Sequence, residues 1–74
     1  MEVQARETAI NYLLKQNLSQ EGLRAFESKV HPKPDFSYLY TGSGRCIEII
    51  VICDGTQCTD WAAYPYDEHN ETCP

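Results

Sequence analysis

The chain has 74 residues and a formal net charge of −5. A chain of this length forms one domain with a marginal core, so it needs close packing, disulfides, a metal or a partner for stability. The acidic balance would repel phosphates and argues against nucleic-acid binding. Because no stretch approaches the roughly 20 apolar residues that cross a bilayer, we expect no membrane span.

The charge is unevenly distributed along the chain. Residues 1–34 carry five Lys or Arg side chains against four Asp or Glu, whereas residues 35–74 carry Arg45 alone against seven acids. Acidity of this kind commonly keeps a small domain soluble. The asymmetry also leaves room for a protein partner with a basic surface.

The first predicted element is a helix over residues 2–16. Apolar side chains recur there with a helical period and fall near one stripe, with two alanines close by: Val3, Ile10, Leu13, Leu14, Ala5 and Ala9. Glu2 and Lys15 suit the two ends of the helix dipole. Asn17 is the expected stop.

A second helix is predicted from about residue 20 to 29, which closes a helical part spanning residues 2–30. Ser19 suits the N-cap, because its hydroxyl can accept a free N–H of the first turn. Leu18 and Leu23 have the spacing of a hydrophobic staple. Gly22 weakens this prediction. One continuous helix, kinked near Asn17, is the alternative.

Residues 31–35 form an extended connector, because each proline of His31-Pro32-Lys33-Pro34 disfavours the α conformation in the residue before it. Beyond it the apolar period changes to two, which predicts a sheet over residues 36–65. Its first strand carries an aromatic face, with Phe36, Tyr38 and Tyr40 on one side. Gly42-Ser43-Gly44 is the expected hairpin turn.

Arg45 to Cys53 reads as the central strand, because it holds the densest apolar run of the chain. Apolar residues occur on both of its faces, so both must be covered. The helices can cover one face. The C-terminal tail, a second subunit or a binding partner must cover the other, which includes Glu48 and Ile50.

Asp54-Gly55 predicts a second hairpin, and a third strand follows over about residues 57–64. A four-residue loop would place Cys53 opposite Cys58. A three-residue loop would place Ile49 opposite Trp61, and we prefer it because it gives the cleaner apolar face. Pro65 ends this strand, and residues 66–74 form a polar tail. The predicted fold is α+β, with two N-terminal helices followed by a three-stranded antiparallel β-meander.

The four cysteines allow three interpretations. Their spacing lacks the tight Cys-x2-Cys pair of structural zinc sites, even with His69 added. A disulfide interpretation pairs Cys53 with Cys58 and Cys46 with Cys73. Because the N-terminal segment shows no signal peptide, we expect a cytoplasmic protein with free thiols.

No grouping of residues predicts catalysis. The two histidines, His31 and His69, fall in predicted loops, and no nucleophile has a base at a spacing that supports it. We therefore expect a protein that is not an enzyme and needs no cofactor.

Aromatic residues interleaved with acids are the remaining candidate for function. We expect Trp61 to lie in the core, and the tail cluster to form an interaction surface, because Tyr is enriched at binding hot spots. The predicted binding residues are Asp60, Tyr64, Tyr66, Asp67 and Glu68.

The sequence thus predicts a small acidic protein-binding module, such as an inhibitor or adaptor of the phage or mobile-element type, that occupies a basic surface of a larger protein. A homodimer, formed through a sheet edge or an uncovered face, is compatible with this role. The alternative is a cysteine-stabilised structural, redox or metal-binding domain.

Overall fold

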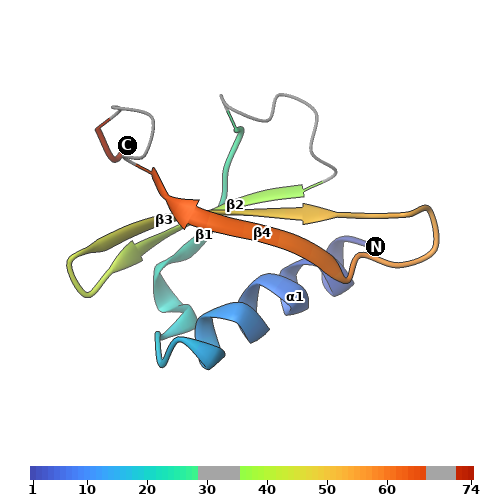
Figure 1. The fold of residues 1–74 in the computed structure, drawn as a ribbon, viewed down its shortest axis with the longest axis horizontal. Helices are drawn as coiled ribbons and strands as arrows, with labels where there is room; N and C mark the ends of the chain where they lie inside the picture. Colours follow the sequence, from blue (N-terminus) through green and yellow to red (C-terminus); the bar gives the residue numbers. More distant parts are fainter. Residues whose placement is uncertain (29–35, 67–71) are drawn as a thin grey trace.

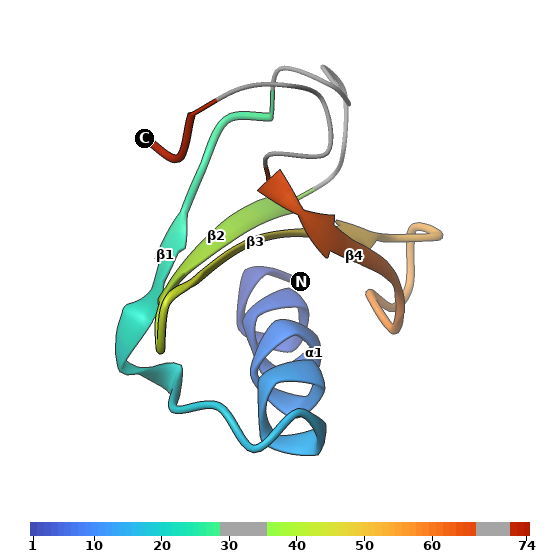
Figure 2. The same cartoon turned by 60° about the vertical axis from the view of Figure 1, so that its left-hand side comes forward.

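The computed structural model describes residues 1–28, 36–66 and 72–74. Its elements, in chain order, are α1 (Glu2–Lys15), a 3-10 turn η1 (Gln20–Gly22), β1 (Leu23–Ala25), β2 (Phe36–Gly42), β3 (Arg45–Ile52) and β4 (Asp60–Pro65). The strands form one antiparallel sheet in the order β1-β2-β3-β4, and α1 lies across one face of it (Figures 1 and 2). The described residues therefore have an α+β arrangement, but with one helix and four strands rather than two helices and a three-stranded meander.

The prediction of a second helix over residues 20–29 is wrong. The Ser19 hydroxyl does accept the N–H of Glu21, at 3.3 Å, but this cap opens only the single turn η1. From Leu23 the chain is extended and pairs with β2, with Leu23 opposite Tyr40. Pairing with β2 satisfies the backbone groups of β1 that face β2, and Gly22 had already lowered the helix propensity of this segment.

The end of α1 is where the sequence predicts it. Asn17 adopts a left-handed conformation with φ of 59°. The N–H of Leu18 donates to the carbonyl of Leu13 at 2.9 Å, and the N–H of Asn17 to that of Leu14 at 3.0 Å. These two bonds form a Schellman motif, which satisfies the last carbonyl groups of the helix.

The helix face that meets the sheet is narrower than predicted. Ala5, Ala9 and Leu13 are fully buried against the sheet, whereas Val3 and Leu14 are 72% and 60% exposed. The small alanines suit a sheet face that already carries large aromatic side chains, because they let the helix axis approach closely. The expectation that Val3 and Leu14 belong to the buried stripe is therefore wrong.

The first hairpin is confirmed. Ser43 and Gly44 join β2 to β3 with φ of 53° and 72°, as in a type I′ turn, whose twist matches that of the flanking strands. The second hairpin has neither of the two registers considered, since Ile49 pairs with Ala63. The observed register differs from the preferred one by two residues, so every side chain keeps its predicted face.

The described residues that follow β1 and those at the C-terminus lie on the side of the sheet that points away from α1, which is its second face (Figure 2). Leu39, Glu48 and Ile50 are buried on this face. Above it, the rings of Phe26 and Tyr66 meet edge to face with centroids 5.6 Å apart. The sequence left open whether the C-terminal tail, a second subunit or a binding partner covers this face. The position of Tyr66 shows that the C-terminal part of the chain covers some of it.

Candidate functional site

All four cysteines are in disulfides, so the expectation of free thiols is wrong. Cys46 is bonded to Cys73 and Cys53 to Cys58, which is the pairing of the disulfide interpretation. The first bond ties the C-terminal residues to the beginning of β3, and the second closes the loop between β3 and β4. Disulfide sulfurs are not thiolate ligands, which removes these residues as zinc ligands.

The loop within the Cys53–Cys58 disulfide is ordered by one carboxylate. Oδ1 of Asp54 accepts the backbone N–H groups of Thr56 and Gln57, at 3.0 and 2.8 Å, and also the Thr56 hydroxyl. Hydrogen bonds from the Thr56 and Gln57 backbone lower the pKa of Asp54 from 3.8 to about 2. The ionised Asp54 side chain therefore fixes the conformation of this connection.

Helix α1 holds the end of the same loop. Gln4 and Thr8 lie one helical turn apart, and their side chains bond the N–H and the carbonyl of Cys58 at 2.6 and 2.7 Å. Both backbone groups of a fully buried residue are thereby satisfied. The start of β4 is thus positioned by the helix as well as by the sheet.

The predicted tail surface is not assembled as expected. Tyr66 is only 4% exposed and packs against Phe26, Tyr64 is half-buried on the second face, and Asp60 is exposed at the other end of β4. Asp67 and Glu68 lie outside the described residues, as do His31, His69 and the connector 31–35. Tyr64, Tyr66 and Asp60 therefore do not share one exposed surface.

Trp61 is the exposed aromatic residue instead. It lies in the outermost strand, 40% exposed, and its ring contacts Tyr12 of α1 with centroids 4.8 Å apart and planes tilted by 54°. The expectation that Trp61 is a core residue is wrong, because β4 has a neighbouring strand on one side only. Its neighbour Asp60 is also exposed, so an acid and an indole are adjacent on the surface.

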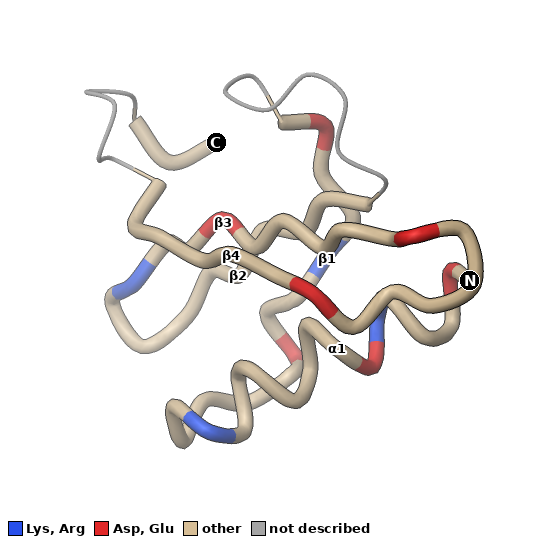
Figure 3. Tube along the Cα trace, turned by 45° about the vertical axis from the view of Figure 1, so that its right-hand side comes forward, with Lys and Arg blue, Asp and Glu red and all other residues tan. Residues whose placement is uncertain are grey.

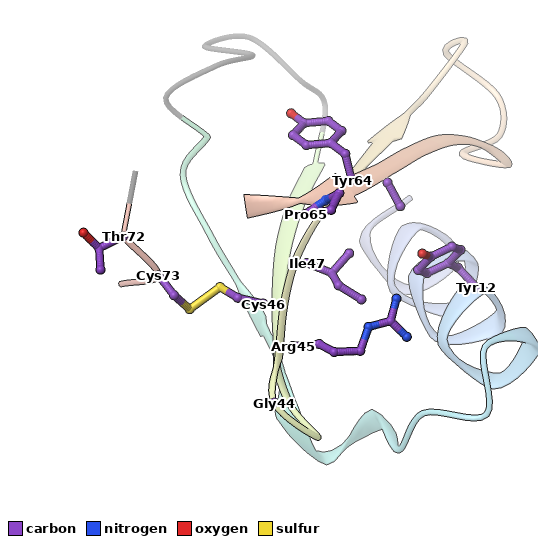
Figure 4. A pocket seen from close by; sticks show the side chains of 10 residues that line it. Tyr12, Gly44, Arg45, Cys46, Ile47, Tyr64, Pro65, Thr72 and Cys73 are labelled. Atoms are coloured by element: carbon purple, nitrogen blue, oxygen red, sulfur yellow. A yellow bond between two sulfur atoms is a disulfide. The ribbon is translucent and has the colours of Figure 1, made fainter. Parts of the chain in front are cut away.

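A cleft of about 690 Å³ opens next to this aromatic pair (Figure 4). Tyr12 forms part of its wall, opposite the side chains of β3 and β4 that point toward α1. The other described residues that line it are Gly44, Arg45, Cys46, Ile47, Ala63, Tyr64, Pro65, Thr72 and Cys73. The volume falls within the range of about 300–1,000 Å³ that is typical of ligand sites.

Arg45 supplies the charge of the cleft. Figure 4 shows its side chain and that of Tyr12 extending into the space between the sheet and the helix. Sequence reasoning missed both residues. The available signal for Arg45 was its status as the single cation among residues 35–74, whereas Tyr12 carried no signal beyond helical spacing.

Charged residues are dispersed over the described part of the chain. Figure 3 shows acidic and basic positions interspersed along the trace rather than gathered on one element. The contrast between the two halves of the sequence therefore does not become one acidic face among these residues. Within the same ranges, no group of three or more His, Cys, Asp or Glu residues could hold a metal ion.

The helix α1 is too short and too polar to cross a bilayer.

Compared with known proteins, the chain matches no protein family, no curated protein and no solved structure.

Proposed function

We propose that this chain is a small disulfide-stabilised domain that binds a protein partner and does not catalyse a reaction. The observation that carries the proposal is the exposed indole of Trp61. It lies on the edge strand β4 and contacts the ring of Tyr12 in α1. Trp and Tyr are enriched at binding hot spots because they offer large contact area at a small cost in conformational entropy. Disulfides on both sides of β4 in the sequence support the rigidity of such a surface.

The partner presents a basic surface in this proposal. Asp60 is exposed beside Trp61, and the whole chain carries a net charge of −5. Complementary charge would speed association and would make it sensitive to salt. An inhibitor or adaptor that occupies a basic site on a larger protein fits this chemistry, although its surface is centred on Trp61 rather than on the tail cluster.

The contact is made by side chains rather than by strand addition. In an antiparallel sheet, alternate residues of an edge strand turn their N–H groups outward, and on β4 these are Trp61, Ala63 and Pro65. The N–H of Trp61 donates to Oδ1 of Asp60 at 3.1 Å, and proline has no N–H. A homodimer through this edge is therefore not part of the proposal.

An oxidising compartment is the setting that this proposal requires. Disulfides persist in extracellular, periplasmic and similar environments and are rare in the cytosol. This setting differs from the cytoplasmic one expected from the sequence, which stays a prediction. The alternative function, a cysteine-stabilised structural domain, shares the disulfides but assigns no role to the Trp61 surface.

Affinity capture with three variants tests the proposal. Trp61→Ala and Asp60→Lys should each lose the proteins that the wild-type chain retains, and raised salt should weaken their capture. Leu14→Ala is the matched control, because it removes an exposed apolar side chain from the outer face of α1.

Equal recovery by all variants would reject the Trp61 surface. A circular-dichroism melt of each variant shows whether the fold is retained, so that loss of binding is not confused with unfolding. Recovery that is insensitive to Asp60→Lys and to salt would reject the basic partner while leaving the Trp61 contact in place.

A further inference from the structure

The cleft beside β4 combines one positive charge with an apolar floor. Its helix side is formed by Tyr12, Ile47 and Ala63, with Arg45 at the start of β3. Ile47 is almost fully buried, whereas Arg45 is exposed. A ligand in this space would therefore meet hydrocarbon, an aromatic ring and a guanidinium group, which Figure 4 shows extending toward Tyr12.

Arg45 has no partner among the described residues. No hydrogen bond or ion pair joins its guanidinium group to them, and none of the described residues that line the cleft is acidic. Guanidinium groups bind carboxylates in a bidentate geometry, with bonds roughly twice as strong as neutral ones.

We infer that this cleft binds a monocarboxylate with an apolar or aromatic body. The carboxylate bonds to Arg45, and the body lies on Ile47 and Ala63 beside Tyr12. This ligand class goes beyond the proposed protein binding, because it occupies the open cleft at Arg45 rather than the exposed face of Trp61.

The number of cations that line the cleft limits the ligand to a single negative charge. Arg45 is the one Lys or Arg residue among the described residues that line the cleft, and the chain as a whole is acidic. A polyanion such as a nucleotide would place further negative charges where no cation receives them. A neutral apolar ligand would form none of the charge-assisted bonds that the guanidinium group offers.

Two sources offer this chemistry, namely a free aromatic acid and the C-terminal carboxylate of a peptide that ends in an aromatic residue. Both place one carboxylate next to an apolar group. The peptide adds backbone groups that can reach the Thr72 side of the cleft, near the Cys46–Cys73 disulfide.

Titrations followed by protein NMR test the inference. The probes are 3-phenylpropionate, its neutral amide, and the tripeptide Gly-Gly-Phe with a free or an amidated C-terminus. The acids should shift the amide signals of residues that line the cleft, and each amide should bind at least about tenfold more weakly because it lacks the charge-assisted bonds. Tighter binding of the tripeptide acid would identify a chain terminus as the ligand, and equal binding would identify a free acid.

Two variants distinguish a direct bond to Arg45 from a general effect of removing one positive charge. Arg45→Gln should weaken the binding of both acids at least about tenfold, whereas Lys15→Gln, which removes an exposed cation at the end of α1, should leave it unchanged. The inference is overturned if no probe binds, if acids and amides bind equally, or if Arg45→Gln has no effect. Because Trp61 is unchanged in these variants, capture of a protein partner is tested separately.

Discussion

The backbone N–H of Cys58 donates a 2.6 Å hydrogen bond to Oε1 of Gln4, 54 positions earlier in the chain. This bond joins the first turn of α1 to the loop that precedes β4. Gln4→Ala would leave a buried N–H without a partner, which we expect to lower the free energy of unfolding by about 1–3 kcal/mol. Urea denaturation measures the change. Asn11→Ala, at an exposed position of the same helix, should have little effect and provides the comparison.

Gly22 is the position where a side chain is least tolerated by packing. A Cβ atom there would overlap the carbonyl oxygen of Thr41 in β2, so backbone would have to move. We expect Gly22→Ala to destabilise the fold by about 1–3 kcal/mol, despite the better helix propensity of alanine. Thermal unfolding gives the measurement, with Glu21→Ala as the neighbouring control. A stabilised Gly22→Ala variant would show that residues 20–25 can adopt the helix that the sequence suggested.

The lowered pKa of Asp54 predicts that the stability of the fold depends on pH. Its pKa falls from 3.8 to about 2 on folding, because the ionised form accepts the Thr56 and Gln57 backbone N–H groups. A lowered pKa contributes stability that is complete above the unfolded value and is lost as the pH falls from about 4 toward 2. Asp54→Asn should therefore reduce the difference in melting temperature between pH 5 and pH 2. The same pH dependence in both proteins would assign it to other carboxylates.

Glu48 is a buried carboxylate on the second face of the sheet. It is 1% exposed, and neither carboxylate oxygen has a hydrogen-bond partner among the described residues. Because a buried polar group without hydrogen bonds is unfavourable, Glu48→Leu should raise the free energy of unfolding by about 1–3 kcal/mol. Glu48→Gln should give a smaller gain, since an amide also requires partners. Destabilisation by both substitutions, measured in urea, would instead reveal a polar partner for Glu48.

The two disulfides should contribute unequally to stability. Cys46 and Cys73 are 27 positions apart, whereas Cys53 and Cys58 are five apart. Loop-closure entropy predicts a loss of about 3.5 kcal/mol for the double Cys→Ser variant at the first pair and about 2 kcal/mol at the second. Guanidinium denaturation ranks the two variants. Thiol labelling of the unfolded wild-type chain without reductant should modify no cysteine, and labelling of all four would show that both bonds are absent.

Local patterns in the sequence were sufficient for much of the fold. The left-handed Asn17 ends α1, and Ser43-Gly44 forms the expected hairpin, because turn chemistry is a property of a few adjacent residues. The short strand β1 could not be foreseen in the same way. Ser19 caps a single turn as readily as a helix, and the deciding contact of Leu23 is with Tyr40, 17 positions later.

The candidate site was less predictable than the fold. Trp61 was assigned to the correct face of the sheet, but its exposure depends on β4 being the outermost strand, which alternation along the chain does not indicate. The pairing of Cys46 with Cys73 belongs to one of the three sets of disulfides that four cysteines can form, and redox state follows the compartment rather than the spacing. The cleft at Arg45 exists only because a helix residue, Tyr12, stands opposite two strands.

The outer edge of β4 has a practical consequence for handling this molecule. An edge strand in which proline removes one outward N–H and Asp60 occupies another is a poor template for cross-β growth. Of the residues that turn outward there, Ala63 alone offers a free N–H, so an added strand would find few donors on this edge. In concentrated solutions, tandem fusions or dense display on a particle, association through the β4 edge should therefore be weak, which leaves the three-residue strand β1 as the other edge of the sheet.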